Sequence, residues 1–211
     1  MFDLITDAHE LSREVLEKQA RKYKVCPFEM ALDVAVWVDA VICDYNYVFD
    51  PNAHLKRFFS EGGEKNYLFL IDEAHNLVER GREMYSAELY KEDVLSIRRL
   101  VKTEDVKLAR RLDECNRQML ELKRECEDYR ILDSVSHVAL KLMNVMGELE
   151  RYLEEHPHSD KREEILNFYF QVRAFLNIHD ILDENYVIYS ELLSDGRFRL
   201  KLLCVNPAVN L

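Results

Sequence analysis

The chain has 211 residues, of which 48% are hydrophobic and 33% are charged, and its net charge is −11 from 29 basic and 40 acidic residues. This composition is typical of an ordered, helix-rich protein of one or two domains, and it excludes a disordered chain. The acidic balance argues against a chain that grips nucleic acid tightly by itself, because free-standing nucleic-acid binders are usually basic.

The spacing of the cysteines and the first residues of the chain indicate the cellular compartment in which the protein resides. Five cysteines are scattered through the sequence, and none of them has C-x-x-C spacing. This pattern indicates a reducing compartment and no disulfide framework. No apolar run approaches the roughly 18 residues of a membrane-spanning helix, and the first residues do not resemble a signal peptide. We therefore expect a cytoplasmic protein that makes no contact with a membrane.

The first predicted elements are two helices and a strand. Residues 9–24 predict a helix with a basic side. Pro27 suits the first turn of a second helix over residues 27–38, because a missing N–H costs nothing at that position. The apolar run at residues 40–43 predicts a short strand. A strand and helices in this order favour an α/β domain.

The next apolar run, residues 67–71, ends in two carboxylates, Asp72 and Glu73, followed by Ala74 and His75. Consecutive apolar residues are typical of a strand buried on both faces of a parallel sheet, and ligands bind at the carboxyl ends of such strands. Two acids there can perform metal-assisted phosphoryl chemistry, one holding Mg²⁺ and the other activating water. A strand that ends in a polar loop is the plainer alternative.

Residues 91–180 change in character, because their apolar residues follow heptad spacing in three series. Helices with a single apolar stripe bury it against one another, so these series predict an antiparallel helical bundle. Cys115 and Cys126 lie on the first stripe and are expected to be core cysteines. The series are Leu108, Leu112, Cys115, Met119, Leu122, Cys126 and Tyr129; Val135, Val138, Leu142, Val145, Leu149 and Tyr152; and Ile165, Phe168, Val172, Phe175 and His179.

The last part of the chain predicts a β-hairpin. Residues 186–192 and 198–204 alternate in the manner of half-exposed strands, and Ser194-Asp195-Gly196 predicts the turn between them.

These motifs together resemble a known family. The D-E-A-H sequence after an apolar run resembles the Walker B box of superfamily 2 helicases. Upstream of it, V-C-P-F-E at residues 25–29 and the stretch at residues 39–51 are similar to the iron–sulfur helicases of the DinG/XPD type. The resemblance is strong over residues 20–85 and weaker at 183–186 and 204–207.

The resemblance implies roles for particular residues. In this family a cysteine before Pro-aromatic is the fourth ligand of a [4Fe–4S] cluster, which implies that role for Cys26; a buried thiol is the alternative. Asp72 would bind the Mg²⁺ of Mg–ATP, and Glu73 would activate the attacking water. His75 would couple the nucleotide to the DNA-binding elements, although a lone histidine is often structural.

Four further residues are weaker candidates for contact with single-stranded DNA. Asn46 and Tyr47 follow the first predicted strand, where turn chemistry explains them almost as well. Arg21 and Lys22 belong to the basic helix that precedes Cys26. Basic residues beside aromatic ones are typical of grooves that bind single strands.

The chain lacks two parts that the family needs. None of its five glycines lies in a P-loop, G-x-x-x-x-G-K-[ST], and three of the four expected cluster cysteines are missing. We therefore expect a helicase fragment whose fold is an α/β piece of a P-loop motor domain with a large inserted all-α bundle, mostly helical overall. The expected domains are the end of the iron–sulfur domain (1–27), part of motor domain 1 with the D-E-A-H box (28–85), a helical insertion that looks like the arch domain (86–183), and a hairpin that returns to the motor domain (184–211).

Two functional interpretations follow. The first is a fragment of an ATP-dependent 5′-to-3′ DNA helicase of DNA repair or replication, inactive alone. Its partners would be single-stranded DNA and the remainder of the helicase, its cofactors in the full-length protein would be Mg²⁺, ATP and a [4Fe–4S] cluster, and it would be a monomer. The alternative is a non-catalytic, acidic helical module that binds other proteins.

Overall fold

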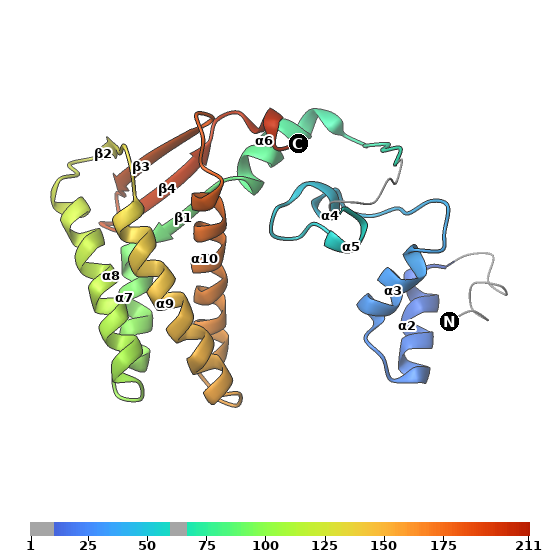
Figure 1. Cartoon of the computed structure of the whole chain (residues 1–211), viewed down its shortest axis with the longest axis horizontal. Coiled ribbons are helices and arrows are strands. Elements are labelled where there is room, and N and C mark those ends of the chain that lie inside the picture. Colours follow the sequence, from blue (N-terminus) through green and yellow to red (C-terminus); the bar gives the residue numbers. More distant parts are fainter. Residues whose placement is uncertain (1–10, 60–66) are drawn as a thin grey trace. The chain divides into compact units, whose positions relative to one another are not determined.

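The computed structural model describes residues 11–59 and 67–211, in two compact units, Met1–Asp44 and Tyr45–Leu211 (Figure 1). The described part of the chain is mostly helical, with one small sheet. The first two residues of the predicted helix 9–24 lie outside the described residues. None of the helices in the described ranges has the length and apolar character needed to cross a membrane.

The first unit contains a pair of helices, α2 (Arg13–Tyr23) and α3 (Pro27–Ala35). The two helices bury Ala20, Met30 and Val34. Helix α2 ends because Lys24 turns into the left-handed region, with φ 54°. Helix α3 has Pro27 in its first turn, as predicted, but it ends three residues earlier than position 38.

The predicted strand at residues 40–43 is wrong. These residues form no strand in the described structure, and the side chain of Ile42 is fully exposed. A strand forms when its backbone makes hydrogen bonds with a neighbouring strand, and an apolar sequence alone does not supply that neighbour.

The second unit begins with short elements around the D-E-A-H box. These are α4 (Asn46–Phe49), α5 (Lys56–Phe59), the 3₁₀ turn η1 (Ala74–Asn76) and α6 (Leu77–Met84). Residues 67–71 do not form the predicted strand either, and no parallel sheet occurs among the residues that the structure describes. The same physical reason applies, because no described strand lies beside this run.

The remainder of the second unit is a helical body, residues 87–204, built on an antiparallel sheet. Its sheet has the order β1-β4-β3-β2, so the two strands farthest apart in the chain, β1 and β4, are neighbours. Helices α7, α8, α9 and α10 run side by side, and α7, α8 and α10 contact the sheet (Figure 1). The elements of the body are β1 (Ala87–Tyr90), α7 (Lys91–Val101), α8 (Val106–Arg124), β2 (Tyr129–Ile131), α9 (Ser136–Glu155), α10 (Arg162–Asp180), β3 (Tyr186–Leu192) and β4 (Phe198–Cys204). The 3₁₀ turn η2 (Pro207–Val209) follows the body.

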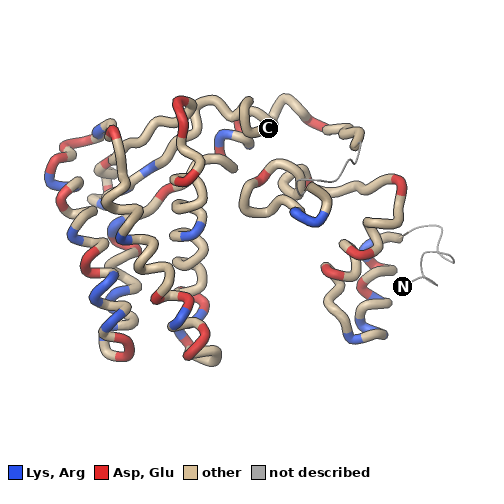
Figure 2. The backbone as a smooth tube through the Cα atoms, viewed as in Figure 1, with Lys and Arg blue, Asp and Glu red and all other residues tan. Residues whose placement is uncertain are grey.

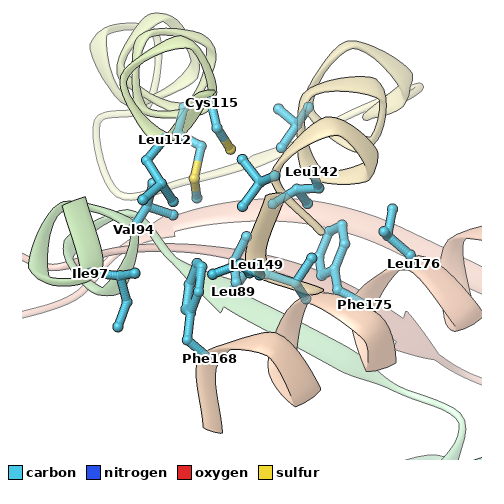
Figure 3. Close-up of a cluster of buried hydrophobic side chains, with 14 of the residues drawn as sticks. Leu89, Val94, Ile97, Leu112, Cys115, Leu142, Leu149, Phe168, Phe175 and Leu176 are labelled. Carbon is cyan, nitrogen blue, oxygen red and sulfur yellow. The ribbon is translucent and has the colours of Figure 1, made fainter. Parts of the chain in front are cut away.

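The heptad series form the core of this body, as predicted, except near their ends (Figure 3). Leu122 and His179 are only half-buried, and Tyr129 lies in the exposed strand β2 because α8 stops at Arg124. Cys115 and Cys126 are buried, which confirms that they are core cysteines, and burial raises the pKa of the Cys115 thiol to about 12.

The sheet belongs to the same core as the helices. The predicted hairpin has the expected bounds, and alternate residues of β4 point inward. Phe198, Leu200 and Leu202 are fully buried against the helices, together with Leu89 of β1. The hairpin is therefore packed into the helical body, and Ala87 of β1 pairs with Leu202 of β4.

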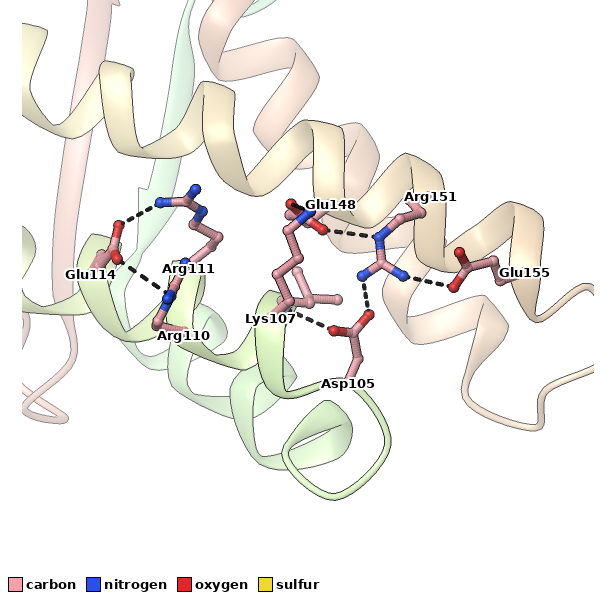
Figure 4. Close-up of polar contacts among 9 residues, drawn as sticks. Asp105, Lys107, Arg110, Arg111, Glu114, Glu148, Arg151 and Glu155 are labelled. Carbon is pink, nitrogen blue, oxygen red and sulfur yellow. Dashed lines mark hydrogen bonds and ion pairs between the residues drawn. The ribbon is translucent and has the colours of Figure 1, made fainter.

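Charges of both signs are interspersed along the helices of this body (Figure 2). An ion-pair group at one end of the body joins α8 to α9 (Figure 4). Asp105 caps α8 by accepting from the Leu108 amide at 2.9 Å and also binds Arg151 of α9. Arg151 in turn contacts Glu148 at 3.0 Å and Glu155 at 2.6 Å. Burial opposes ionisation of Asp105, but the Leu108 amide and Arg151 outweigh it and hold its pKa below the ordinary value.

Candidate functional site

The D-E-A-H box lies on an exposed turn between an extended apolar segment and α6. The segment at residues 67–71 exposes 87% of Leu68 and 91% of Leu70. Directly after it, the Glu73 amide donates to Oδ1 of Asp72 at 2.9 Å. Nε2 of His75 lies 3.4 Å from Oε2 of Glu73. The turn therefore gathers the three predicted site residues at one exposed point.

Glu73 has an unusual backbone conformation. Its φ of 51° and ψ of 36° place it in the left-handed region, which is uncommon for a residue with a side chain. Left-handed residues that are not glycine are enriched at functional sites, because surrounding contacts hold them there. This conformation turns the chain between the extended segment and η1.

An aromatic cluster holds the segment that precedes the box. The ring of Phe69 lies 6.5 Å from that of Phe49 in α4 and 6.3 Å from that of Phe59 in α5, measured between centroids. Tyr67 packs edge-on against Phe59 at 5.5 Å, and its hydroxyl donates to the carbonyl of Phe58 at 3.2 Å. Helices α4 and α5 are thus fixed beside the D-E-A-H turn by ring contacts.

The Asp72 carboxylate fits the needs of Mg²⁺ bound to a nucleotide. Magnesium is usually bound through one or two carboxylates, several waters and the substrate phosphates. Asp72 is exposed, its Oδ1 is oriented by the Glu73 amide, and no contact to Oδ2 occurs among the described residues. Glu73 is equally exposed, so water can reach its carboxylate.

The remaining predicted residues are distributed over both units. Asn46 and Tyr47 lie in α4, in the same unit as the D-E-A-H turn. Arg21, Lys22 and Cys26 lie in the first unit, where Cys26 immediately precedes α3.

Cys26 is exposed within its unit. In the described residues, no group of three or more His, Cys, Asp or Glu side chains is placed to hold a metal ion. A [4Fe–4S] cluster needs four ligands, so these residues do not fit a complete cluster.

Sequence reasoning missed Phe49, Phe69 and Tyr85, which position the turn. The sequence pattern predicts for Phe69 only a place in an apolar strand. The Tyr85 hydroxyl lies 2.9 Å from the Phe49 carbonyl, which is 36 residues away in the chain. A backbone carbonyl is present at every residue, so no sequence signal could have identified this partner.

Comparison with known proteins finds relatives of the part of the chain that contains this turn. Residues 3–94 match the DEAD_2 family model, a match that includes Cys26, α4 and the D-E-A-H turn. The matched region is thus related to the iron–sulfur superfamily 2 helicases of the DinG/XPD type.

Particular relatives support the same class. The chain is 36% identical over 73 residues to the Fanconi anemia group J protein homolog of Gallus gallus, covering 35% of this chain and 6% of that protein. It is 32% identical over 81 residues to the regulator of telomere elongation helicase 1 homolog of Anopheles gambiae, covering 38% and 8%. The corresponding Drosophila melanogaster homolog is 30% identical over 81 residues, with the same coverage. The matched stretch is therefore a small part of each relative's length.

Proposed function

We propose that this chain supplies the Mg²⁺-binding and water-activating half of the ATP-hydrolysis site of a DNA helicase. The observation that carries the proposal is the exposed turn that brings Asp72, Glu73 and His75 together directly after an apolar segment. The relation of the matched region to superfamily 2 helicases supports the same conclusion.

Each residue of the turn has a distinct role in this proposal. Asp72 would hold the Mg²⁺ that accompanies the nucleotide, and the Glu73 amide orients its carboxylate. Glu73 orients the attacking water and accepts its proton. His75, 3.4 Å from the Glu73 carboxylate, links the hydrolysis site to the elements that contact DNA. Bound Mg²⁺ supplies charge stabilisation to the transferring phosphoryl group.

The exposed apolar segments support a larger motor domain. Leu68 and Leu70 are 87% and 91% exposed, although leucine is among the residues most often buried. Ile42 in the other unit is fully exposed as well. We infer that these segments pair with strands of the domain that carries the phosphate-binding loop, which this sequence lacks. Pairing would bury both faces of the run at residues 67–71 and present Asp72 at the carboxyl end of a strand.

The remaining assignments are part of the same proposal. Cys26 serves as one of four ligands of a [4Fe–4S] cluster when three further cysteines are present. Residues 86–183 form the arch-like insertion of the helicase, and Arg21, Lys22, Asn46 and Tyr47 contact single-stranded DNA. The activity is 5′-to-3′ unwinding in DNA repair or replication.

ATP hydrolysis by a longer protein that contains a P-loop tests the proposal. Glu73→Gln should abolish hydrolysis and leave binding of a fluorescent ATP analogue within about twofold, because glutamine keeps the shape but cannot accept a proton. Glu79→Gln is the matched control, since Glu79 lies on exposed α6, where it pairs with Arg82. Full hydrolysis by the Glu73→Gln protein would refute the role of Glu73. The 211-residue chain alone should hydrolyse no ATP.

The second candidate is an acidic helical module that binds other proteins. The observation that favours it is the helical body, which has its own buried core and does not contain the D-E-A-H turn. If the longer protein binds no Mg–ATP, this second function becomes the better explanation.

A further inference from the structure

Helix α6 starts immediately after the D-E-A-H turn, and its far end meets two segments that are distant in the sequence. The Tyr85 hydroxyl lies 2.9 Å from the carbonyl oxygen of Phe49 in α4 and 2.9 Å from that of Asn210 after η2. A phenol carries one proton, so these two acceptors share a single donor. Tyr85 is 9% exposed. Burial, and then the nearby Asp50 carboxylate, raises the pKa of Tyr85, so the hydroxyl keeps its proton at neutral pH.

Phe49 contacts both flanks of the D-E-A-H turn. Its ring packs against Phe69, which precedes the turn, at 6.5 Å between centroids. Its carbonyl accepts from Tyr85, which follows the turn. Phe49 thus links helix α4, which carries Asn46 and Tyr47, to both sides of the box through its ring and its carbonyl. A displacement of the turn relative to α4 is felt at these two contacts.

The segment after β4 is seated on the same helix. A methyl group added at Gly81 would lie 2.8 Å from Cδ1 of Leu211 and 3.1 Å from Cβ of Pro207, so α6 and residues 207–211 approach each other closely at this point. Nε of Arg82 donates to the Val205 carbonyl at 3.0 Å. These contacts connect α6 to residues 205–211, which continue from β4 of the helical body.

We propose that Tyr85 is a positioning residue that couples the D-E-A-H turn to α4 on one side and to residues 205–211 on the other through one shared proton. When α4 moves away, the hydroxyl donates fully to Asn210 and tightens the turn at residues 207–211. When that turn opens, Phe49 receives the whole hydrogen bond. The use of this coupling in a motor rests on the proposed function, but the coupling itself needs no nucleotide.

Hydrogen exchange on the 211-residue chain, followed by mass spectrometry, provides the first test. Tyr85→Phe removes only the hydroxyl and should speed amide exchange about fivefold at residues 46–55 and 207–211, the effect of losing one hydrogen bond. Tyr152→Phe is the matched control, because it removes another buried phenol whose hydroxyl donates to Glu104 at 2.7 Å. Unchanged exchange at both segments, or an equal change in the control, would overturn the proposal.

A double-mutant cycle tests the sharing of the proton. Phe69→Ala removes the ring that holds Phe49 and should speed exchange at residues 46–55. It should at the same time slow exchange at residues 207–211 about twofold, because Asn210 no longer shares its donor. In the Tyr85→Phe background, Phe69→Ala should leave residues 207–211 unchanged. Faster exchange at both segments with intact Tyr85 would show that no proton is shared. Because nucleotide is absent, this outcome is independent of whether the proposed ATP site exists.

Discussion

The helical body and the D-E-A-H segment adjoin in the sequence, yet their apolar residues have opposite surroundings. Leu112, Leu142 and Leu149 of the body are fully buried, whereas Leu68 and Leu70 beside the box are almost fully exposed. The body has the core that a stable domain needs, while the segment with the candidate chemistry is held by ring contacts, by the hydrogen bond from Tyr67 to Phe58 and by its connection to α6. The comparison indicates that the stable core and the candidate site lie in different parts of this chain.

The largest expected effect comes from removing the sheet from the body. The segment 86–205 should unfold cooperatively, whereas the segment 91–180 should lack a cooperative transition, because it loses Leu89, Phe198, Leu200 and Leu202 from the core. Burying each of these side chains contributes about 1.5–3 kcal/mol. Thermal melts by circular dichroism compare the two. A sharp melt of 91–180 at the temperature of 86–205 would show that the helices need no sheet.

A charge placed in each region should give unequal effects. Leu142→Asp should destabilise the body by about 4 kcal/mol or more, since it buries an unpaired carboxylate. Leu68→Asp, at a position that is 87% exposed, should change stability by less than about 0.5 kcal/mol. Urea unfolding of the whole chain measures both. Equal losses of stability in the two variants would mean that the segment at residues 67–71 is buried in solution.

The ion-pair group predicts a pH dependence of the body. The folded-state pKa of Asp105 lies below that of the unfolded chain, so its contribution is present above about pH 4 and is lost as the pH falls through the folded value. At pH 7, Asp105→Asn should cost about 1–2 kcal/mol, and wild type and variant should converge in acid. Urea unfolding at a series of pH values measures this difference. Asp160→Asn, at an exposed position, is the control, and its difference in stability from wild type should not change over the pH series.

The smallest effect is expected at the surface of α8. The Arg110 side chain is 64% exposed, and its Nε lies 3.9 Å from the Glu114 carboxylate. Exposed pairs of this kind contribute little, so Arg110→Ala should change the free energy of unfolding by less than about 0.5 kcal/mol. A larger loss of stability, measured by urea unfolding, would show that Arg110 has a structural role in the ion-pair group.

Periodicity predicted the parts of the fold that depend on local pattern. The heptad series located α8, α9 and α10, and alternation located both strands of the hairpin with their observed bounds. The predictions of strands at 40–43 and 67–71 were wrong, because an apolar run becomes a strand only beside another strand. The short strands β1 and β2 were missed, because runs of four and three residues carry too little alternation.

The candidate site was predictable in composition but not in geometry. Asp72, Glu73 and His75 are neighbours in the sequence, so a motif can find them. The left-handed backbone of Glu73 and the two carbonyl acceptors of Tyr85 depend on tertiary contacts. The acceptor residues lie 36 and 125 positions away from Tyr85, beyond the reach of any local pattern.

The pairing of β1 with β4 bears on how such a chain can change during evolution. Because Ala87 lies opposite Leu202, the polypeptide enters and leaves the helical body at adjacent points. Paired residues in neighbouring antiparallel strands are only about 5 Å apart. The number of residues between these strands can therefore change while residues 84 and 205 keep their places. A genome could enlarge, shorten or exchange the body in a single recombination event, while the D-E-A-H segment on the other side of that boundary stays under its own selection.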